Sequence, residues 1–274
     1  MRPADSQSLA VGFFDGVHMG HRAILSRATS ALTFRDHPMA LIDPARKPRL
    51  IMTLDDRLAA RSCGIERVEV LDFTPALASM PPEEFAERFI LSKRFNKVVC
   101  GEDWRFGRSG AGDADFLRAM GIEVEEVAYA AYDGIRVSSS RIRRTLESGD
   151  IVSANAMLSR RFKIRGRVFS GKGLGGKLGF PTVNLMPEGL EIKLPRGVYE
   201  VCASGVKGLA NYGVAPTMGE NAWKQDVVEA HFLETPGCDI SEIELVRFLR
   251  PELKFASLEE LQLQIKNDFD KIKA

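Results

Sequence analysis

The sequence predicts two architectures in one chain, an α/β domain with a parallel sheet and then an antiparallel β-barrel closed by a helix. Strand and helix signals alternate from Leu9 to Gly101, the pattern of a parallel sheet covered on both faces. Near Leu158 the apolar residues begin to alternate along short segments punctuated by Gly and Pro, which favours a barrel. We therefore expect domains over residues 1–157 and 158–274.

The composition is that of a folded globular protein of one or two domains, with 274 residues, 45% hydrophobic and 27% charged. Lys and Arg number 38 against 37 Asp and Glu, so the global charge favours neither a nucleic-acid nor a membrane partner. No apolar run approaches the roughly 18 to 20 residues that span a bilayer. The four cysteines are widely spaced and read as reduced thiols. We expect a cytoplasmic protein with small-molecule substrates, either a monomer or a weak homo-oligomer.

Helix and strand boundaries in the first half carry ordinary local signals. Thr53 with Asp56 three residues later predicts a capped helix start, and Pro81 and Pro82 predict the start of another helix. Strands are expected at residues 9–11, 31–34, 67–73 and 97–101.

The stretch LAVGFFDGVHMGHRAIL, residues 9–25, reads as a strand, a glycine-rich turn and a helix. Unpaired N–H groups at the start of such a helix favour an anion, and His18 and His21 add donors suited to a polyphosphate. A zinc site is the weaker alternative, because His-x-x-His lacks the Cys or Glu partners of zinc signatures. The other expected phosphate-binding residues of this turn are Gly12, Phe14, Asp15 and Gly20.

Two later segments complete the candidate site of the first half. The loop GEDWRFGRSGAG, residues 101–112, combines aromatic side chains with arginines and suits a lid that stacks on a flat ring, or else it is an exposed turn. In VSSSRIRR, the serines are ordinary helix caps, but Ser139 and Arg143 together also suit a second phosphate clamp. Residues 136–167 hold nine basic and two acidic residues, so any anion attraction is local.

The stretch SGKGLGGKLGFPTVN contains two incomplete fingerprints, a dinucleotide G-x-G-x-x-G and a P-loop with Leu178 in place of its Ser or Thr. Both require a helix next, and Gly179 and Pro181 interrupt any such helix. A glycine-rich loop remains whose backbone N–H groups can wrap phosphates. Its candidate residues are Gly171, Gly173, Gly175 and Lys177.

Two pairs of polar residues in the second half lie two positions apart on predicted strands, so each pair shares a face. Thr182 and Asn184 could offer oxygens to Mg²⁺. A carboxylate such as Glu229, beside His231, is costly to bury on the inner face of a barrel unless it is used or paired. We expect it to act as a general base on an alcohol; the alternative is an outward polar residue.

The last segment, SLEELQLQIKNDFDKI, predicts the closing helix. Ser257 and Glu260 form a capping box at its start. Its apolar face is expected to consist of Leu258, Leu261, Ile265, Phe269 and Ile272.

The motifs GFFDGVHMGH, GEDWRFG, VSSSRIR, GKLGFPTVN, GVYEV, VEAHFLE and FLRPELKF occur in this order and cover nearly the whole chain. In this the chain resembles the bifunctional bacterial riboflavin kinase/FMN adenylyltransferases, often called FAD synthetases. The resemblance implies a Rossmann-like nucleotidyltransferase domain joined to a riboflavin-kinase-like barrel. It also implies two reactions, phosphorylation of riboflavin by ATP to FMN and adenylylation of FMN to FAD with release of pyrophosphate, and Mg²⁺ as cofactor.

The resemblance assigns roles in the first domain. His18 and His21 match the catalytic histidines that hold the ATP phosphates and stabilise the transferring group. Ser139 and Arg143 match a second phosphate clamp. The flavin-binding lid matches Asp103, Trp104, Arg105 and Phe106.

In the barrel, the resemblance makes Thr182 and Asn184 the Mg²⁺ ligands and Glu229 the base that takes the riboflavin 5′-hydroxyl proton. It adds Arg250 as a flavin-binding residue. Both reactions are in-line attacks on phosphorus, which need positioning and charge neutralisation above all.

Departures from the family pattern leave two alternatives open. Only twelve residues separate His21 from Phe34, which predicts a shortened wall of the adenylylation site, and Gly176 and Ala215 stand where arginines are common. The chain could catalyse one reaction, with the other domain only binding flavin. It could also be a nucleotide-binding or RNA-binding protein without enzymatic activity, although the near-zero net charge argues against RNA.

Overall fold

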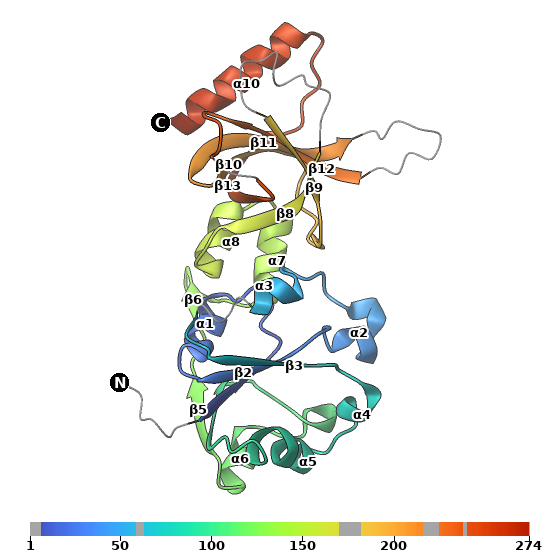
Figure 1. Cartoon of the computed structure of the whole chain (residues 1–274), viewed down its shortest axis with the longest axis vertical. Helices are drawn as coiled ribbons and strands as arrows, with labels where there is room; N and C mark the ends of the chain where they lie inside the picture. Colours follow the sequence, from blue (N-terminus) through green and yellow to red (C-terminus); the bar gives the residue numbers. More distant parts are fainter. Residues whose placement is uncertain (1–6, 59–62, 170–181, 216–224, 238–239, 274) are drawn as a thin grey trace. The chain divides into compact units, whose positions relative to one another are not determined.

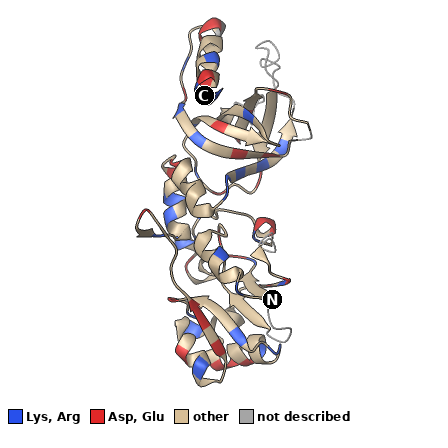
Figure 2. Cartoon of the chain, turned by 90° about the vertical axis from the view of Figure 1, so that its left-hand side faces the viewer, with Lys and Arg blue, Asp and Glu red and all other residues tan. Residues whose placement is uncertain are grey.

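A computed structural model describes residues 7–58, 63–169, 182–215, 225–237 and 240–273 (Figure 1). The chain forms two compact units, Met1–Ser139 and Ser140–Ala274. The predicted domain boundary between residues 157 and 158 stays a prediction. The division into units falls earlier in the chain, so that the helices Ser139–Glu147 and Ile151–Leu158 group almost entirely with the second unit. Acidic and basic residues are interspersed along the chain in both units (Figure 2). Among the described residues, no helix is long and apolar enough to cross a membrane.

The first unit is built on a parallel sheet in the order β3-β2-β1-β4-β5. Strand β3 ends at Leu71, two residues before the predicted Phe73, because Leu71 pairs with Phe34, the last residue of β2. The other predicted strands are confirmed to within one residue at each end. The strands are β1 (Ser8–Val11), β2 (Ser30–Phe34), β3 (Arg67–Leu71), β4 (Lys97–Gly101) and β5 (Glu123–Val127).

Apolar clusters cover both faces of this sheet, as the strand–helix alternation predicts. In β1, Leu9 and Val11 face one cluster, while Ala10 faces the other. Because successive side chains of a strand point to opposite faces, a strand buried on both sides reads as a continuous apolar run. This burial fixes the carboxyl ends of the strands, which is the edge where ligands bind in such sheets.

The predicted helix starts of the first unit are confirmed. The Asp56 N–H donates to Thr53 Oγ1, and the helix that begins at Pro82 continues into a π-helical turn, Glu87–Leu91. A small hairpin, β6 (Ala131–Tyr132) and β7 (Ile135–Arg136), follows the sheet. The helices are α1 (Met19–Leu25), α2 (Met39–Ile42), α3 (Leu54–Leu58), α4 (Pro75–Ala78), α5 (Pro82–Ala86) and α6 (Ala114–Ala119), with 3₁₀ turns at Pro44–Arg46 and Arg108–Gly110.

The second unit contains the predicted antiparallel barrel, closed in the order β10-β11-β12-β9-β8-β13. Two helices precede it and one follows it (Figure 1). Its elements are α7 (Ser139–Glu147), α8 (Ile151–Leu158), β8 (Phe162–Phe169), β9 (Thr182–Pro187), β10 (Gly197–Ala203), β11 (Val206–Ala215), β12 (Gln225–Phe232), β13 (Glu242–Pro251) and α10 (Leu258–Lys273).

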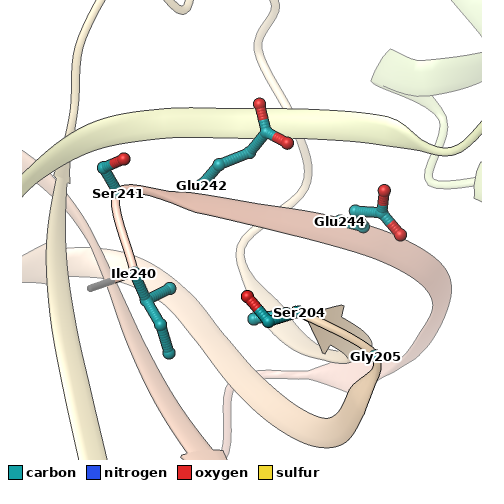
Figure 3. A pocket seen from close by; sticks show the side chains of 7 residues that line it. Ser204, Gly205, Ile240, Ser241, Glu242 and Glu244 are labelled. Atoms are coloured by element: carbon teal, nitrogen blue, oxygen red, sulfur yellow. The ribbon is translucent and has the colours of Figure 1, made fainter. Parts of the chain in front are cut away.

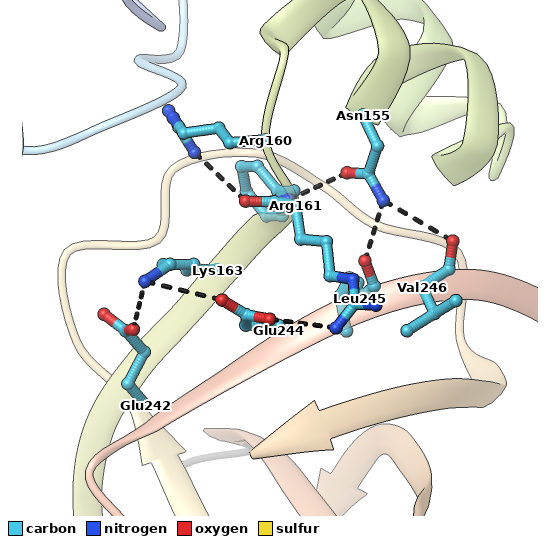
Figure 4. Close-up of polar contacts among 9 residues, drawn as sticks. Asn155, Arg160, Arg161, Lys163, Glu242, Glu244, Leu245 and Val246 are labelled. Atoms are coloured by element: carbon cyan, nitrogen blue, oxygen red, sulfur yellow. Dashed lines mark hydrogen bonds and ion pairs between the residues drawn. The ribbon is translucent and has the colours of Figure 1, made fainter. Parts of the chain in front are cut away.

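The side chain of Asn155 links helix α8 to the barrel by hydrogen bonds (Figure 4). Asn155 Nδ2 donates to the carbonyl of Leu245 at 2.8 Å, and Asn155 Oδ1 accepts from the Phe162 N–H at 2.7 Å. A half-buried amide that satisfies backbone groups of two strands fixes the helix in register with both. Three of the eight strand residues of β8 are basic, and ion pairs join two of them, Lys163 and Arg165, to Glu242 of β13.

Helix α10 is the predicted closing helix. Its start is capped as expected, since the Glu260 N–H donates to Ser257 Oγ at 3.2 Å. Phe269 and Ile272 of the predicted apolar face are buried against the barrel, whereas nothing is described of the Leu258 side chain. A buried ion pair between Asp268 and Arg250 of β13, 2.8 Å long, adds a specific polar contact beneath the helix.

Candidate active sites

The turn between β1 and α1 has an unusual backbone conformation. Phe14, Gly16 and Val17 all have positive φ angles, of 55°, 84° and 39°. The Gly12 N–H donates to the carbonyl of Leu32, and the Val17 N–H donates to the carbonyl of Phe14, each at 3.1 Å. Positive φ at two residues that are not glycine is strained, and such strain is retained where the surrounding structure requires the shape.

His18 and His21 lie together at the start of α1. His18 is the N-cap residue, and its Nδ1 accepts the His21 N–H at 3.4 Å. The two rings stack with centroids 3.6 Å apart and planes 19° apart. Burial, with a smaller contribution from Arg136, lowers the pKa of His18 to about 4. Burial and the neighbouring His18 hold the pKa of His21 well below its usual value. Both rings are therefore neutral near pH 7.

A neutral ring carries one hydrogen, so the bond accepted by His18 Nδ1 places that hydrogen on Nε2. The Nδ1 atom of His21 is buried and has no hydrogen-bond partner among the described residues. Buried polar atoms are normally satisfied, so an unsatisfied one at this position is a candidate contact for a ligand. The pair can thus hold a phosphate without adding net charge.

The neutral histidines make the first unit acid-sensitive. Because burial depresses the folded-state pKa of His18 from 6.5 to about 4, the unfolded chain binds more protons between these pH values. The stabilising contribution is complete above pH 6.5 and is lost as the pH falls through about 4. We expect a loss of about 3 kcal/mol in the free energy of unfolding, at 1.36 kcal/mol per pKa unit.

Denaturant unfolding between pH 7.5 and 4 measures this loss. A Trp223→Phe background leaves Trp104 as the only tryptophan, so that its fluorescence reports the first unit. His18→Asn is the control, because Asn does not titrate and its unfolding should depend less on pH. Parallel pH profiles for the two proteins would contradict the assignment.

Asp15 and Gly20, both predicted to bind phosphate, help to fix the shape of the turn. Asp15 is 2% exposed, and its Oδ1 accepts the Ile51 N–H at 2.9 Å. The Asp15 carbonyl accepts the hydroxyl of Ser139 at 2.9 Å, which joins the predicted second clamp to the histidine turn. A Cβ on Gly20 would lie 3.3 Å from the His18 ring, so glycine there leaves the ring its space.

Arg57 of α3 supports the same turn and was missed by sequence reasoning. It is 2% exposed, and its guanidinium lies 4.0 Å from the centroid of the Phe13 ring. Its hydrogen bonds join the turn to the end of β2, a role that a lone arginine in a short helix does not reveal. The acceptors are the carbonyls of Phe13, Phe34 and Arg35 and the hydroxyl of Thr33.

The predicted lid residues divide between a cavity and two ion pairs. Trp104 and Phe106 stack with centroids 4.7 Å apart, and both line an apolar cavity of about 210 Å³. Arg105 lines the same cavity and pairs with Asp113. Its wall also includes Val11 and Phe34, at the carboxyl ends of β1 and β2, and a flat aromatic ring could stack there.

Asp103 pairs with Arg136 at 2.7 Å, and the Arg136 guanidinium lies 3.3 Å from the centroid of the Tyr129 ring. Arg136 also contributes to the lowered pKa of His18, so a cation stands near the histidine pair. Sequence reasoning counted Arg136 only as the start of a basic stretch. The sequence did hold a signal for Arg136, because it directly precedes VSSSR, the segment of the predicted second phosphate clamp.

The remaining predicted phosphate-binding residues lie in the second unit or outside the described chain. Arg143 lies on α7, where its Nη1 donates to Ser140 Oγ at 3.2 Å. The glycine-rich loop candidates lie outside the described residues; these are Gly171, Gly173, Gly175 and Lys177.

In the barrel, the pairing of β9 with β12 brings the predicted kinase residues together. Asn184 lies directly opposite Glu229, and Thr182 lies opposite His231. Thr182 Oγ1 is 3.3 Å from His231 Nδ1, and His231 Nε2 is 4.0 Å from Glu229 Oε1. The hydroxyl of Thr182, the amide of Asn184 and the carboxylate of Glu229 therefore lie on the same face of two neighbouring strands.

Beside these residues lies a cavity of about 650 Å³ between the barrel and α10, large enough for a tricyclic ring. Glu229, His231 and Asn211 supply polar groups to its barrel wall. The predicted flavin-binding Arg250 also lines it, held by the buried Asp268 of α10. Its apolar wall includes Val198, Leu209, Phe255, Leu261 and Ile265.

The expectation that Glu229 lies on the inner face of the barrel is wrong. The alternate residues of β12 form the interior; Val228, Ala230 and Phe232 are each at most 1% exposed. Glu229 is on the outer face beneath α10, and its side chain is 43% exposed. The carboxylate of Glu229 is thus accessible to a substrate.

The donor chemistry here fits Mg²⁺. Within the described residues, no group of three or more His, Cys, Asp or Glu side chains is placed to hold a metal ion. Mg²⁺ often takes only one or two protein ligands and completes its shell with water and substrate phosphates. The oxygens of Thr182 and Asn184, on one face of β9, match that requirement.

A further cavity of about 280 Å³ lies at the turn between β10 and β11 (Figure 3). Glu242 and Glu244 line it, and both carboxylates are ion-paired with Lys163. The Lys163 and Arg165 side chains hold the pKa of Glu242 below its usual value. These pairs explain the acidic residues structurally.

The fold and the two candidate sites suit one class of protein, the transferases that handle phosphate groups. Comparison with known families agrees. The FAD synthetase family model matches residues 2–141, and the riboflavin kinase family model matches residues 158–274. The chain belongs to the bifunctional riboflavin kinase/FMN adenylyltransferase family.

Curated members of the family align along almost their full lengths. The enzyme of Pseudomonas fluorescens is 32% identical over 98% of this chain and 93% of its own. The enzymes of Bacillus subtilis strain 168 and Escherichia coli K12 are 30% and 31% identical, over 95% and 97% of this chain and 89% and 91% of their own.

A crystal structure from Streptococcus pneumoniae, described as a macrolide-efflux protein, has a TM-score of 0.84 at 25% identity. The alignment covers 98% of this chain and 94% of the Streptococcus pneumoniae chain. Its name belongs to that protein, and the likeness supports the fold.

Proposed function

We propose that this chain makes FAD from riboflavin in two steps, with riboflavin phosphorylated at the barrel and FMN adenylylated at the α/β unit. ATP, riboflavin, FMN and FAD are the substrates and products of the family. The observation that carries the site assignment is the pairing of β9 with β12, which sets Thr182 and Asn184 beside Glu229. This convergence favours a working kinase site over a barrel that only binds flavin.

At the barrel, riboflavin is bound in the cavity beneath α10, with its ring against the apolar wall and near Arg250. Glu229 accepts the proton of the 5′-hydroxyl as the oxygen attacks the γ-phosphorus of ATP, and the bond from the γ-phosphorus to the bridging oxygen breaks with ADP as the leaving group. Thr182 and Asn184 would hold Mg²⁺, which neutralises phosphate charge when bound. Held in line, the reactants need little more than positioning and charge stabilisation.

At the α/β unit, the neutral ring of His18 donates from Nε2 to an ATP phosphate oxygen, and His21 lies stacked against it. A phosphate oxygen of FMN attacks the α-phosphorus of ATP and pyrophosphate leaves. This nucleophile is already ionised, so no strong base is required. The FMN ring stacks in the cavity lined by Trp104 and Phe106. Arg136 supplies positive charge near the transferring group.

We also propose that the protein acts in the cytoplasm, where ATP is available, on small molecules and without a nucleic-acid partner. Chromatography of riboflavin, FMN and FAD over time, with ATP and Mg²⁺ present, tests the proposal. FMN should appear first and then convert to FAD. FMN alone would mean that the α/β unit lacks its activity. FAD from supplied FMN but nothing from riboflavin would place the loss in the barrel.

A further inference from the structure

We propose that His231 is a positioning residue of the kinase site, which orients the hydroxyl of Thr182 with one ring nitrogen and faces the carboxylate of Glu229 with the other. The inference rests on the riboflavin kinase activity proposed above. It assigns a task to a side chain that the proposed chemistry does not use.

The geometry singles out this residue. His231 is 9% exposed and has one neighbour of assigned chemistry at each ring nitrogen. Nδ1 lies 3.3 Å from Thr182 Oγ1, and Nε2 lies 4.0 Å from Glu229 Oε1. Thr182 is its cross-strand partner and Glu229 is two residues before it on the same face of β12, so the backbone ladder fixes both relationships.

The hydroxyl of Thr182 has one hydrogen and two lone pairs. An oxygen that is to offer a lone pair to a cation must direct its hydrogen elsewhere, and His231 Nδ1 is an acceptor at the right distance. A metal ligand oriented by such an outer contact typically loses about tenfold to a hundredfold in metal affinity when the contact is removed.

The same hydrogen bond fixes the other side of the ring. A neutral imidazole that accepts at Nδ1 carries its hydrogen on Nε2, which faces Glu229. A separation of 4.0 Å is too long for a direct hydrogen bond but suits a bridging water or a tightened contact when substrate binds. One ring thus couples the orientation of the metal ligand to that of the base.

Two substitutions of His231 test its contact with Thr182 and its contact with Glu229 separately. His231→Asn keeps an amide oxygen near the position of Nδ1 but cannot reach Glu229. His231→Gln places its amide near the position of Nε2 and removes the acceptor beside Thr182. We expect His231→Gln to weaken Mn²⁺ binding about tenfold or more, and His231→Asn to leave it nearly unchanged. The measurement is electron paramagnetic resonance of Mn²⁺ titrated into the full chain with a non-hydrolysable ATP analogue.

The kinase assay gives the complementary pattern. His231→Gln should raise the Mg²⁺ concentration for half-maximal FMN formation, whereas His231→Asn should lower kcat about tenfold with little change in that concentration. Conversion of supplied FMN to FAD by the same preparation should be unchanged in both variants.

Thr182→Val provides the matched test of the link. If His231 acts through Thr182, Thr182→Val combined with His231→Gln should weaken Mn²⁺ binding no more than Thr182→Val alone. Additive losses, or equal effects of the Asn and Gln variants, would overturn the inference. If wild-type protein forms no FMN, the proposed function fails, while the Mn²⁺ titrations still decide whether His231 acts through Thr182.

Discussion

Glu229→Gln is expected to reduce FMN formation from riboflavin by at least about a hundredfold, because the amide cannot accept the proton of the 5′-hydroxyl. The replacement preserves size and shape, and the side chain is 43% exposed, so the barrel should fold normally. Conversion of supplied FMN to FAD should be unchanged. Initial rates of the two reactions, measured on one preparation, test this difference.

Glu234→Gln is the matched control, since Glu234 is an exposed carboxylate just beyond β12. It should leave both rates near those of the wild type. If Glu229→Gln lowered both reactions equally while the chain stayed folded, the assignment of separate sites would be wrong. An unchanged rate of FMN formation would remove Glu229 from the role of base.

His21→Ala is expected to have the opposite effect. FAD formation should fall about a hundredfold to a thousandfold, the usual cost of losing one group that stabilises transition-state charge. FMN formation from riboflavin should be retained. The same pair of rate measurements applies, with FMN supplied for the first and riboflavin for the second.

His21 is buried and stacks on His18, so the Ala variant could disturb the turn itself. His21→Gln retains more volume and an amide, and it should show the same direction of change. His37→Asn is the control, because His37 is a histidine of the same unit that contacts Phe13. A similar loss in the control would point to disturbance of the turn, and full FAD formation by both His21 variants would remove His21 from the site.

The sequence was sufficient for elements whose signals are local. The His18–His21 turn could be predicted because both residues, their glycines and the helix start lie within one short segment. The capping pairs Thr53–Asp56 and Ser257–Glu260 are confirmed for the same reason. The short segment after His21 holds the rest of α1, which ends at Leu25, and β2, which begins at Ser30.

The face of Glu229 was the main misinterpretation, although the sequence held a signal for it. In VEAHF the apolar and polar residues alternate, and the fully buried positions of a small barrel belong to the apolar set. Period-two alternation gives the two faces, and the apolar set of β12 would have placed Glu229 outside. The alternation does not show that α10 packs over the outer face of β12 and makes this face the wall of a cavity.

Arg57 and Arg136 show what local patterns cannot supply. The acceptors of Arg57 come from residues 13 and 33–35, and its role appears only when α3 lies beside the end of β2. Arg136 contributes to the site through its charge near His18. An isolated arginine in either position has the sequence appearance of a solvated surface residue.

By itself the sequence determined the order of strands and helices, the change from α/β to barrel, and the location of the histidine turn at the start of a helix, because periodicity and capping depend on neighbours in the chain. Only the tertiary structure decided that Thr182 lies opposite His231, that Glu229 lies on the outer face, and that α10 forms a cavity over it. These depend on strand register and on packing between residues far apart in sequence, which local periodicity does not encode.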